Sequence, residues 1–486
     1  MKYLKLLLLP CLLYASVAVS SAQDLEMGYF LGGNPYAYRM NPAFQSERSM
    51  MSIALGQTGL GAWSNLGVST LMYPGGDGNL YTFMNDRVSS QEFLGKLHKR
   101  NSIDADLNVN LLAVGFWSGD SFMTVDLNLR SVNAVSAPYD LFRFLKEGVG
   151  SSTSFDLSGT GFRSKTFCEL AFGWSHNYSN MFNIGFRVKA LVGALEMEAQ
   201  MKSLTMSLND ERWDVAAQGE LNMSSPSLSI QKTADGELDF ESIRMTQDYG
   251  PAGYGAAVDV GFSWNILPVV TVSGAMLDLG AIRWNRTIRG KTPETSYSWV
   301  PSENEAIDPT SSDSERALNR EMDEMGDALS GLFKYMDAGS GQSVFDMLPF
   351  RVNLGAEFRM PFYDRLSVGA LYTGRGGATF ARHTGRLSLN WNPLDFLSLS
   401  TGTTLNKLGE SIGFALSLHP VGVNLMLGCD YIPFRCVNIA PLFEDLPVEY
   451  RRYAVIPADR MNLNLYLGLN LAFGERHLDH RRRIRW

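Results

Sequence analysis

Few residues of this sequence are spaced for catalysis or metal binding. Its six histidines are scattered, and only His477 and His480 lie close together, outside any pattern of thiol or carboxylate partners typical of a zinc site. No Gly-x-Ser-x-Gly turn, phosphate-binding loop or paired-cysteine metal motif occurs. We therefore expect no enzyme, no catalytic residue, no metal ligand and no cofactor.

Charged residues instead recur at every second position of strand-like stretches. Asp and Asn alternate with apolar residues through 103–111, and the stretch 123–130 repeats the pattern. A period of two puts the two sets on opposite faces of a strand. A charge facing hydrocarbon at mid-depth costs about 2–4 kcal/mol, so in a membrane barrel these side chains must face the lumen. The expected lumen-facing residues are Asp104, Asp106, Asp126, Arg130, Glu169, Arg187, Lys189, Asp259, Glu357 and Arg386.

This expected lumen carries both signs of charge. A wall of one sign is typical of an ion-selective pore, whereas a mixed wall can pair with itself and with a segment that fills it. The pattern favours a plugged or narrow lumen over a wide, water-filled one. The alternative, that these groups line ordinary solvent, stays open.

The stretch 462–473 is the clearest strand. Leucine occupies every second position from 463 to 471, and mostly polar residues lie between. A sandwich core could use such a strand, and so could a barrel wall with lipid outside and water inside. Its end resembles the C-terminal signal by which outer-membrane barrels are recognised for assembly, which implies the barrel-assembly machinery as a partner. The residues of this expected assembly signal are Tyr466, Gly468, Leu471 and Phe473.

The connections between expected strands alternate in length. Short ones at positions such as 117–120 and 265–267 follow long ones such as 134–162 and 207–252. Short periplasmic turns and long extracellular loops alternate in this way in outer-membrane barrels. We predict an all-β membrane protein, an antiparallel transmembrane β-barrel of about 14 strands that spans residues 65–474.

The N-terminus and composition indicate the compartment. Residues 1–22 combine Lys2 and Lys5, an apolar run and a small-residue cleavage site, which predicts a secretory signal peptide and an outer-membrane, Gram-negative location. No later run is long enough for a transmembrane helix. The net charge of −8 argues against nucleic acid. Cys429 and Cys436 could close a loop disulfide, or they and Cys168 could all be free thiols.

Residues 23–64 are rich in Gly, Met and aromatic side chains and contain Asn41, Pro42 and Ala43. An Asn-Pro pair is ordinarily a turn. Near a mature N-terminus, this tripeptide resembles the Asn-Pro-Ala of long-chain fatty-acid transporter (FadL-type) barrels and their uncharacterised relatives in Bacteroidota. The resemblance implies that residues 23–64 form a hatch inside the barrel lumen.

Helical patterns are confined to the long connections, at 91–99, 139–147 and 312–336. The last belongs to an acidic insertion, residues 290–349, expected to cover the extracellular mouth, and residues 475–486 form a basic tail. Apolar helix residues are candidates to line a pocket, although packing against neighbouring loops is the more common role for any one of them. They are Leu141, Phe142, Leu145, Leu329, Leu332 and Phe333.

Two functions follow as expectations. By resemblance, the barrel would allow passive passage of small hydrophobic or amphipathic compounds across the outer membrane, with lipid around it and a small hydrophobic ligand as its substrate. Alternatively, a non-transporting barrel would dock secretion or surface proteins through its long acidic loops.

Overall fold

The chain folds into a closed antiparallel barrel of 14 strands. The computed structural model describes residues 25–477, with gaps at 54–55, 76–79, 149–151, 180, 210–212, 247, 249, 286, 293–294, 300–333, 377–381, 407–408, 433–435, 439–454 and 458–461. In spatial order the wall contains β1 (Ser49–Ile53) with β2 (Thr58–Ser64), β5 (Arg100–Ser118), β6 (Ser121–Pro138), β8 (Gly161–Ser179), β9 (Phe182–Asn209), β13 (Gly253–Leu267), β14 (Val270–Trp284), β18 (Val344–Met347) with β19 (Phe350–Arg359), β20 (Leu366–Gly376), β21 (Arg382–Leu394), β22 (Leu397–Asn406), β23 (Gly409–Leu418), β24 (Gly422–Ile432) and β27 (Asn462–Phe473). The predicted fold class is confirmed.

The wall begins earlier than the sequence predicted. Ser49 of β1 pairs with Phe473 of β27, and β2 also lies between β27 and β5, so both segments together form the first wall strand. The expected boundary at residue 65 is therefore wrong, and residues 66–72 contain the short helix α2 (Val68–Leu71). The split into two short pieces, of 5 and 7 residues, hid the period of a full-length strand.

The closing strand β27 divides its two faces as its alternation predicts. Leu465 and Leu471 on the outer face are 54% and 59% exposed, whereas Asn464 and Asn470 are almost completely buried in the lumen. The neighbouring strands also point apolar side chains outward, and together these side chains form a band around the barrel. That band is the surface a membrane barrel presents to lipid.

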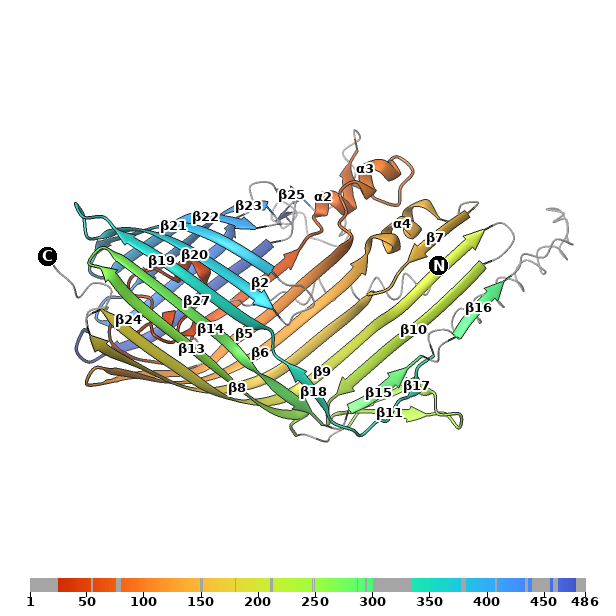
Figure 1. Ribbon diagram of the computed structural model, residues 1–486, viewed down its shortest axis with the longest axis horizontal. Coiled ribbons are helices and arrows are strands. Elements are labelled where there is room, and N and C mark those ends of the chain that lie inside the picture. The colour runs from red at the N-terminus through yellow and green to blue at the C-terminus, as the bar shows by residue number, and fades with distance from the viewer. Residues whose placement is uncertain are drawn as a thin grey trace, which may run out of the picture.

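The wall continues on one side into a long projection at the right of Figure 1, here called the extension. A strand of about 9–11 residues crosses a bilayer, yet β9 has 28. The C-terminal part of β9 pairs with β10 (Trp213–Ser224) and β7 (Ser152–Asp156). Short strands extend this sheet or pair beside it: β15 (Thr287–Lys291), β16 (Thr295–Trp299), β17 (Met336–Asp337) and the hairpin of β11 (Leu228–Lys232) and β12 (Leu238–Met245).

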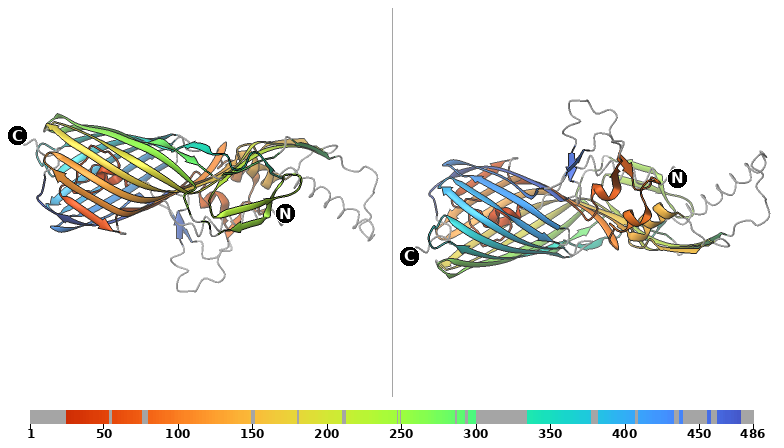
Figure 2. Two further views of the ribbon diagram at one scale, coloured as in Figure 1. Left: turned by 90° about the horizontal axis from the view of Figure 1, so that it is seen from below. Right: turned by 90° about the horizontal axis from the view of Figure 1, so that it is seen from above.

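Helices cover one face of the extension (Figure 2). They are α2, α3 (Ser90–Leu94) and α4 (Tyr139–Glu147), with β3 (Met72–Pro74) and β4 (Leu80–Thr82) between them. The α4 helix matches its predicted bounds and ends at Gly148, which has φ of +69°. The helix expected over 312–336 falls largely outside the described residues, as do the signal peptide and most of the tail. Within the described part of the chain, no helix has the length and apolarity needed to cross a membrane.

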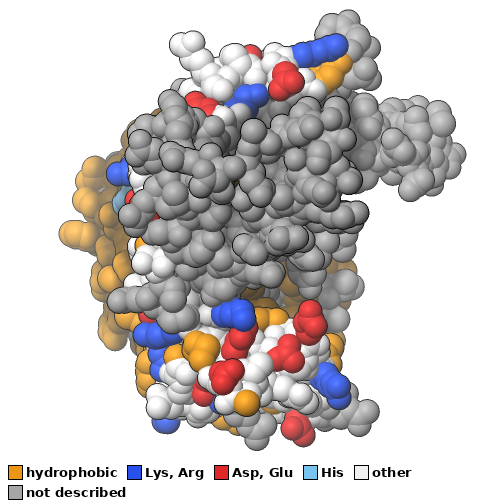
Figure 3. Space-filling model, turned by 90° about the vertical axis from the view of Figure 1, so that its right-hand side faces the viewer, with side chains coloured by type: hydrophobic (Ala, Val, Ile, Leu, Met, Phe, Trp, Pro, Cys, Tyr) orange, Lys and Arg blue, Asp and Glu red, His pale blue; other side chains and the backbone are white. Residues whose placement is uncertain are grey.

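We call the end where β27 finishes the near rim and the end that bears the extension the far rim. Seen from the far end, Lys, Arg, Asp and Glu side chains are mixed on the described surface, and apolar side chains lie on the barrel flank behind (Figure 3). On the extension, hydrogen bonds from Lys232 and Ser340 lower the pKa of Asp337 to about 2. A small separate sheet is formed by β25 (Cys436–Asn438) and β26 (Val455–Pro457).

The lumen is filled by the N-terminal segment, residues 25–48, here called the plug. It contains two short 3-10 helices, η1 (Glu26–Gly28) and η2 (Ala37–Arg39), and nearly all its side chains are buried. Leu25, Met27 and Tyr36 pack against wall residues in one apolar cluster, and Tyr29 and Phe30 pack in a second. The plug is therefore a packed part of the fold.

Candidate functional site: a plugged lumen

Seven charged wall residues form one buried network, here called the wall cluster. Arg187 contacts Asp126 at 2.8 Å and Asp259 at 3.3 Å. Lys189 lies 2.8 Å from Asp259 and 2.6 Å from Asp278. Arg130 completes it with contacts of 2.8 Å to both Glu169 and Asp278. Because β6, β8, β9, β13 and β14 are consecutive wall strands, these inward side chains meet across the strand pairs.

Asp278 is the member of the wall cluster that the sequence prediction missed. Alternation along β14 would send it outward, but the register shifts beside Asp259, and Asp278 has φ of +61°. This bulge turns the carboxylate inward, and its own N–H donates to Asp259 Oδ1 at 2.7 Å. The sequence did indicate a departure from regular alternation, because alternation would leave the Asp278 carboxylate facing lipid, where a charge is energetically costly.

A smaller charged group, here called the plug latch, lies on other wall strands and includes the plug. Arg386 of β21 contacts Glu26 of the plug at 2.9 Å and Asp430 of β24 at 3.3 Å. The Asp430 carboxylate also accepts the backbone N–H groups of Glu26 and Met27 at 3.0 and 2.7 Å. Asn464 donates to the same carboxylate at 2.8 Å. The plug therefore supplies two of the partners of this wall carboxylate, and Arg386 and Asn464 of the wall supply two more.

The predicted hatch motif lies at the other end of the plug. Asn41 accepts the N–H of Ala43 at 3.0 Å and donates to the carbonyl oxygen of Phe262 in β13 at 3.0 Å. Asn183 of β9 donates to the carbonyl oxygen of Ala43 at 3.0 Å. The Asn-Pro turn thus joins the plug to β9 and β13 by hydrogen bonds, and we call this contact the plug seat.

Two paired glycines make this seat possible. Gly185 of β9 lies opposite Gly261 of β13. A Cβ on Gly185 would come 2.1 Å from the carbonyl oxygen of Pro42, and one on Gly261 would come 2.2 Å from Asn41 Oδ1. Other glycines of the wall meet plug side chains in the same way, such as Gly355 against Tyr29. The wall is therefore shaped to the plug.

An apolar cluster of wall residues lies on the far-rim side of the wall cluster. Its largest members are Phe167, Leu191, Ile282 and Trp284, which are all at most 1% exposed and belong to one packed cluster. Along β8, β9 and β14 each lies closer to the far rim than the charged residue of the same strand. The apolar cluster therefore lies between the wall cluster and the far rim.

The remaining lumen predictions also face inward. Asp106 pairs with Arg375 at 2.7 Å, and Asp104 lies on the same face of β5. Glu357 accepts a hydrogen bond from Ser367 at 2.6 Å. Within the closing strand, Tyr466 is buried and Gly468 lies against the ring of Tyr36 in the plug. Leu471 and Phe473 face outward, so the expected assembly signal has two lumen and two lipid-facing residues.

The expected apolar pocket is not gathered in one place. Leu141 of α4 packs with Phe155 and Leu204, whereas Phe142 packs with Phe93 in a separate cluster. Leu145 is half-buried on the same helix, and Leu329, Leu332 and Phe333 lie outside the described residues. Where described, these side chains pack the helices onto the extension. Cys429 is a free thiol, and the described residues contain no group of His, Cys, Asp and Glu that could hold a metal ion.

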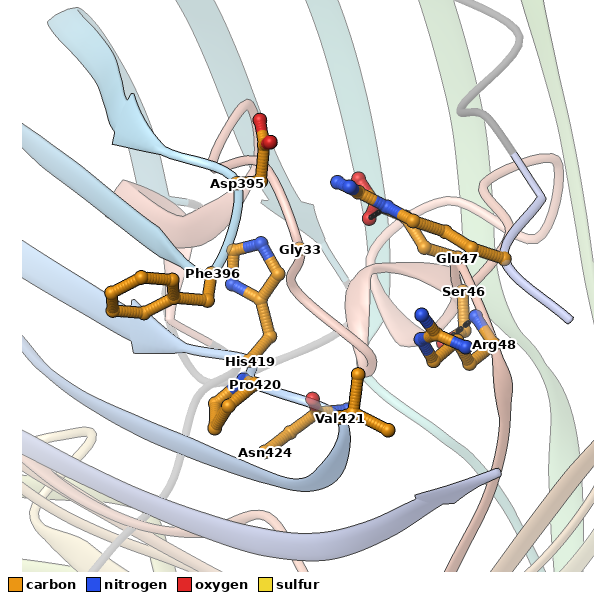
Figure 4. Close-up of a pocket in the computed structure, with 11 residues that line it drawn as sticks. Gly33, Ser46, Glu47, Arg48, Asp395, Phe396, His419, Pro420, Val421 and Asn424 are labelled. Atoms are coloured by element: carbon orange, nitrogen blue, oxygen red, sulfur yellow. Dashed lines mark hydrogen bonds and ion pairs between the residues drawn. The ribbon is translucent and has the colours of Figure 1, made fainter. Parts of the chain in front are cut away.

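The plug joins the wall at the near rim through Ser46, Glu47 and Arg48. Arg476 contacts Glu47 at 2.8 Å, and Arg48 donates to the carbonyl oxygen of Gly474 at 2.7 Å. These contacts attach the end of the plug to the end of the closing strand. Beside them lies a pocket of about 260 Å³ (Figure 4). Its other lining comes from Gly33, from the turns at 395–396 and 419–421, and from Asn424.

Comparisons with known proteins give one family. The model of DUF5723, a family of unknown function, matches residues 42–430. No curated protein matches the sequence.

Several solved structures are similar in fold. The toluene transporter TbuX of Ralstonia pickettii has a TM-score of 0.44 at 9% identity, covering 94% of this chain and 100% of its own. The monoaromatic hydrocarbon channel CymD has a TM-score of 0.43 at 8% identity, covering 95% and 99%. A FadL homologue of Pseudomonas aeruginosa has a TM-score of 0.39 at 11% identity, covering 94% and 100%.

Proposed function

The chain belongs to this family of unknown function, and from its geometry we propose that it is an outer-membrane barrel for passive transport, closed by its own N-terminal plug. One observation carries the proposal: the lumen of a 14-strand wall is filled by an N-terminal segment that the wall is shaped to receive. The compounds proposed to pass are small and hydrophobic or amphipathic.

The number of strands supports a lumen that needs a plug. Eight strands enclose a space that the wall's own side chains fill, whereas 16–18 strands leave an aqueous channel. A wall of 14 strands lies between these limits. Its interior exceeds what inward side chains fill, and the plug occupies the remainder.

The division of contacts supports a plug that can leave. The wall cluster pairs its charges among wall residues, and the described plug touches it chiefly through Tyr38, which donates to Asp126 at 2.6 Å. The wall can therefore keep most of these ion pairs without the plug. Glu26 is different, because its partner Arg386 belongs to the wall. Release of the plug would break the latch and leave the wall cluster largely intact.

The apolar cluster on the far-rim side of the wall cluster supports a hydrophobic or amphipathic substrate. A solute that arrives from the far rim would pass Phe167, Ile282 and Trp284 before it reaches the wall cluster. The outward apolar band supports a location in a lipid bilayer, with the near rim and its short turns on the periplasmic side. The partners in this proposal are outer-membrane lipid, the barrel-assembly machinery and the transported compound.

Uptake by proteoliposomes tests this function. The initial rate of entry of a labelled fatty acid is compared for protein-free liposomes, the wild type, and a variant that combines Glu26→Gln with Tyr38→Phe. We expect uptake above protein-free liposomes and a faster rate for the variant, because both plug contacts are weakened. Arg365→Gln is the matched control, since Arg365 bonds to Pro393 and Asp395 on the neighbouring turn. If neither the wild type nor the plug variant exceeds protein-free liposomes, transport is ruled out.

The extension favours a second candidate function, docking of a secreted or surface protein. It bears exposed apolar residues on the β11–β12 hairpin, with Met245 84% and Phe240 42% exposed. Retention of one defined secreted protein by the purified barrel would support docking if Met245→Asp abolishes it. Val421→Asp at the near rim, where Val421 is 82% exposed, serves as the control.

A further inference from the structure

The near-rim pocket has two chemically different sides. Ser46, Glu47 and Arg48 line one side, and Phe396, His419 and Pro420 line the other (Figure 4). The first side belongs to the link between plug and wall, and the second to two short turns of the barrel. A ligand here would therefore touch both the plug and the wall.

The charged side chains that line the pocket differ in whether they have an ion-pair partner. Glu47 pairs with Arg476, and Asp395 pairs with Arg365 at 3.1 Å. Arg48 has no carboxylate partner among the described residues, and its guanidinium has one described acceptor, the carbonyl oxygen of Gly474. A guanidinium carries five N–H donors, so donors remain for an anion.

The opposite side offers flat, apolar surface. The ring of Phe396 is exposed at 45% for the residue, and Pro420 lies beside it. The His419 imidazole stands between Phe396 and the plug backbone at Gly33. Gly33 has φ of +62°, and a Cβ there would lie 2.4 Å from that imidazole. The pocket wall is thus built by close contact between plug and turn.

The volume limits the size of a ligand. About 260 Å³ is slightly below the range of about 300–1,000 Å³ typical of sites for drug-sized ligands. At about 30 Å³ per water, it corresponds to about nine water molecules. An organic ligand of about ten non-hydrogen atoms would fill it.

We propose that this pocket binds a small organic anion, with its oxyanion on Arg48 and its apolar part against Phe396 and Pro420. The bound anion joins the plug link to the turns at 395–396 and 419–421. It thereby stabilises the plugged barrel. The inference goes beyond transport and does not depend on it.

Calorimetry on the full mature chain in lipid nanodiscs tests the proposal, with benzoate as the probe and empty nanodiscs subtracted. We expect saturable binding of one benzoate. Benzyl alcohol, which lacks the charge, should bind at least about tenfold more weakly, and inorganic phosphate, which lacks the apolar part, should do the same. Arg48→Gln should weaken benzoate binding about fivefold or more, and Arg48→Lys should restore part of it.

Two further variants keep the test independent of folding. Phe396→Ser changes the apolar side without touching the plug link, and it should also weaken benzoate binding. Arg359→Gln removes a near-rim arginine that does not line the pocket, and it should leave binding unchanged. The proposal is overturned if benzoate does not bind, if Arg48→Gln and Phe396→Ser bind it like the wild type, or if phosphate binds equally well. Fatty-acid uptake in the same nanodisc-derived protein, reconstituted into liposomes, reports transport separately.

Discussion

The wall cluster and the plug latch are both buried in one lumen, yet they are completed by different parts of the chain. In the wall cluster, Arg187 and Lys189 pair with carboxylates of neighbouring wall strands. In the latch, Asp430 is satisfied by the backbone of Glu26 and Met27, and Arg386 binds the Glu26 side chain. The first set of contacts holds wall strands to one another, and the second also holds the plug to the wall.

The wall cluster therefore stabilises the barrel, whereas the latch keeps the plug in the lumen. A buried charge that loses its partner is strongly destabilising, by about 3–5 kcal/mol. In the wall cluster no partner can leave without unfolding the wall. In the latch, Glu26 can leave with the plug and reach water. The same chemistry thus fixes the barrel in one place and provides a releasable contact in the other.

The largest expected effect comes from Arg187→Met. It removes the cation between Asp126 and Asp259, which are both completely buried. We expect the barrel to lose about 3–5 kcal/mol of stability. The measurement is the temperature at which the folded barrel is lost on electrophoresis without prior boiling. An unchanged transition would show that the cluster does not hold the wall.

Arg386→Met is the matched change in the latch. It leaves the Glu26 and Asp430 carboxylates close together without a cation, so the plug should undock. We expect plug amides to lose about 2–3 kcal/mol of protection in hydrogen exchange, because Arg386 binds Glu26 of the plug. The barrel transition should move much less than in Arg187→Met. Equal losses of barrel stability in the two variants would contradict the distinction between wall cluster and latch.

The sequence predicted the wall cluster better than the latch, for physical reasons. Asp126 and Arg187 lie on regular strands, where alternation alone places them inward. Asp278 required a bulge, which local periodicity does not reveal. Asp430 and Glu26 are 404 residues apart, and their contact depends on where the plug settles in the closed barrel. The mixed charges of the wall favoured a plugged or narrow lumen, and the Asn41 motif, through a family resemblance, indicated that residues 23–64 enter it.

The same reasoning explains the two other departures. The first wall strand is split between β1 and β2, and its place is set by its partners β27 and β5. Leu141 and Phe142 are adjacent in the sequence but point into separate clusters, because helix positions one apart do not share a face. Both outcomes depend on contacts between segments that are distant in the sequence.

A smaller effect is expected from Gly185→Ala, which tests the seat without changing charge. The added methyl would meet the carbonyl oxygen of Pro42 at 2.1 Å, so the plug backbone must shift. We expect the plug to lose about 1–2 kcal/mol of protection by the same exchange measurement. Gly173→Ala on the neighbouring strand, where a Cβ would meet the side chains of Thr124 and Arg187, is the control for wall packing. If both variants affect only barrel melting, the glycine is not part of a plug seat.

The smallest effect is expected from Tyr38→Phe, which removes a hydrogen bond between the plug and the wall cluster. Asp126 loses the phenol at 2.6 Å but keeps Arg187 at 2.8 Å, so the wall cluster stays paired. We expect about 1 kcal/mol less protection of plug amides and no change in barrel melting. A barrel transition lowered as far as in Arg187→Met would mean that the plug is a member of the wall cluster. The plug could then not leave without loss of the wall, and transport would need another path.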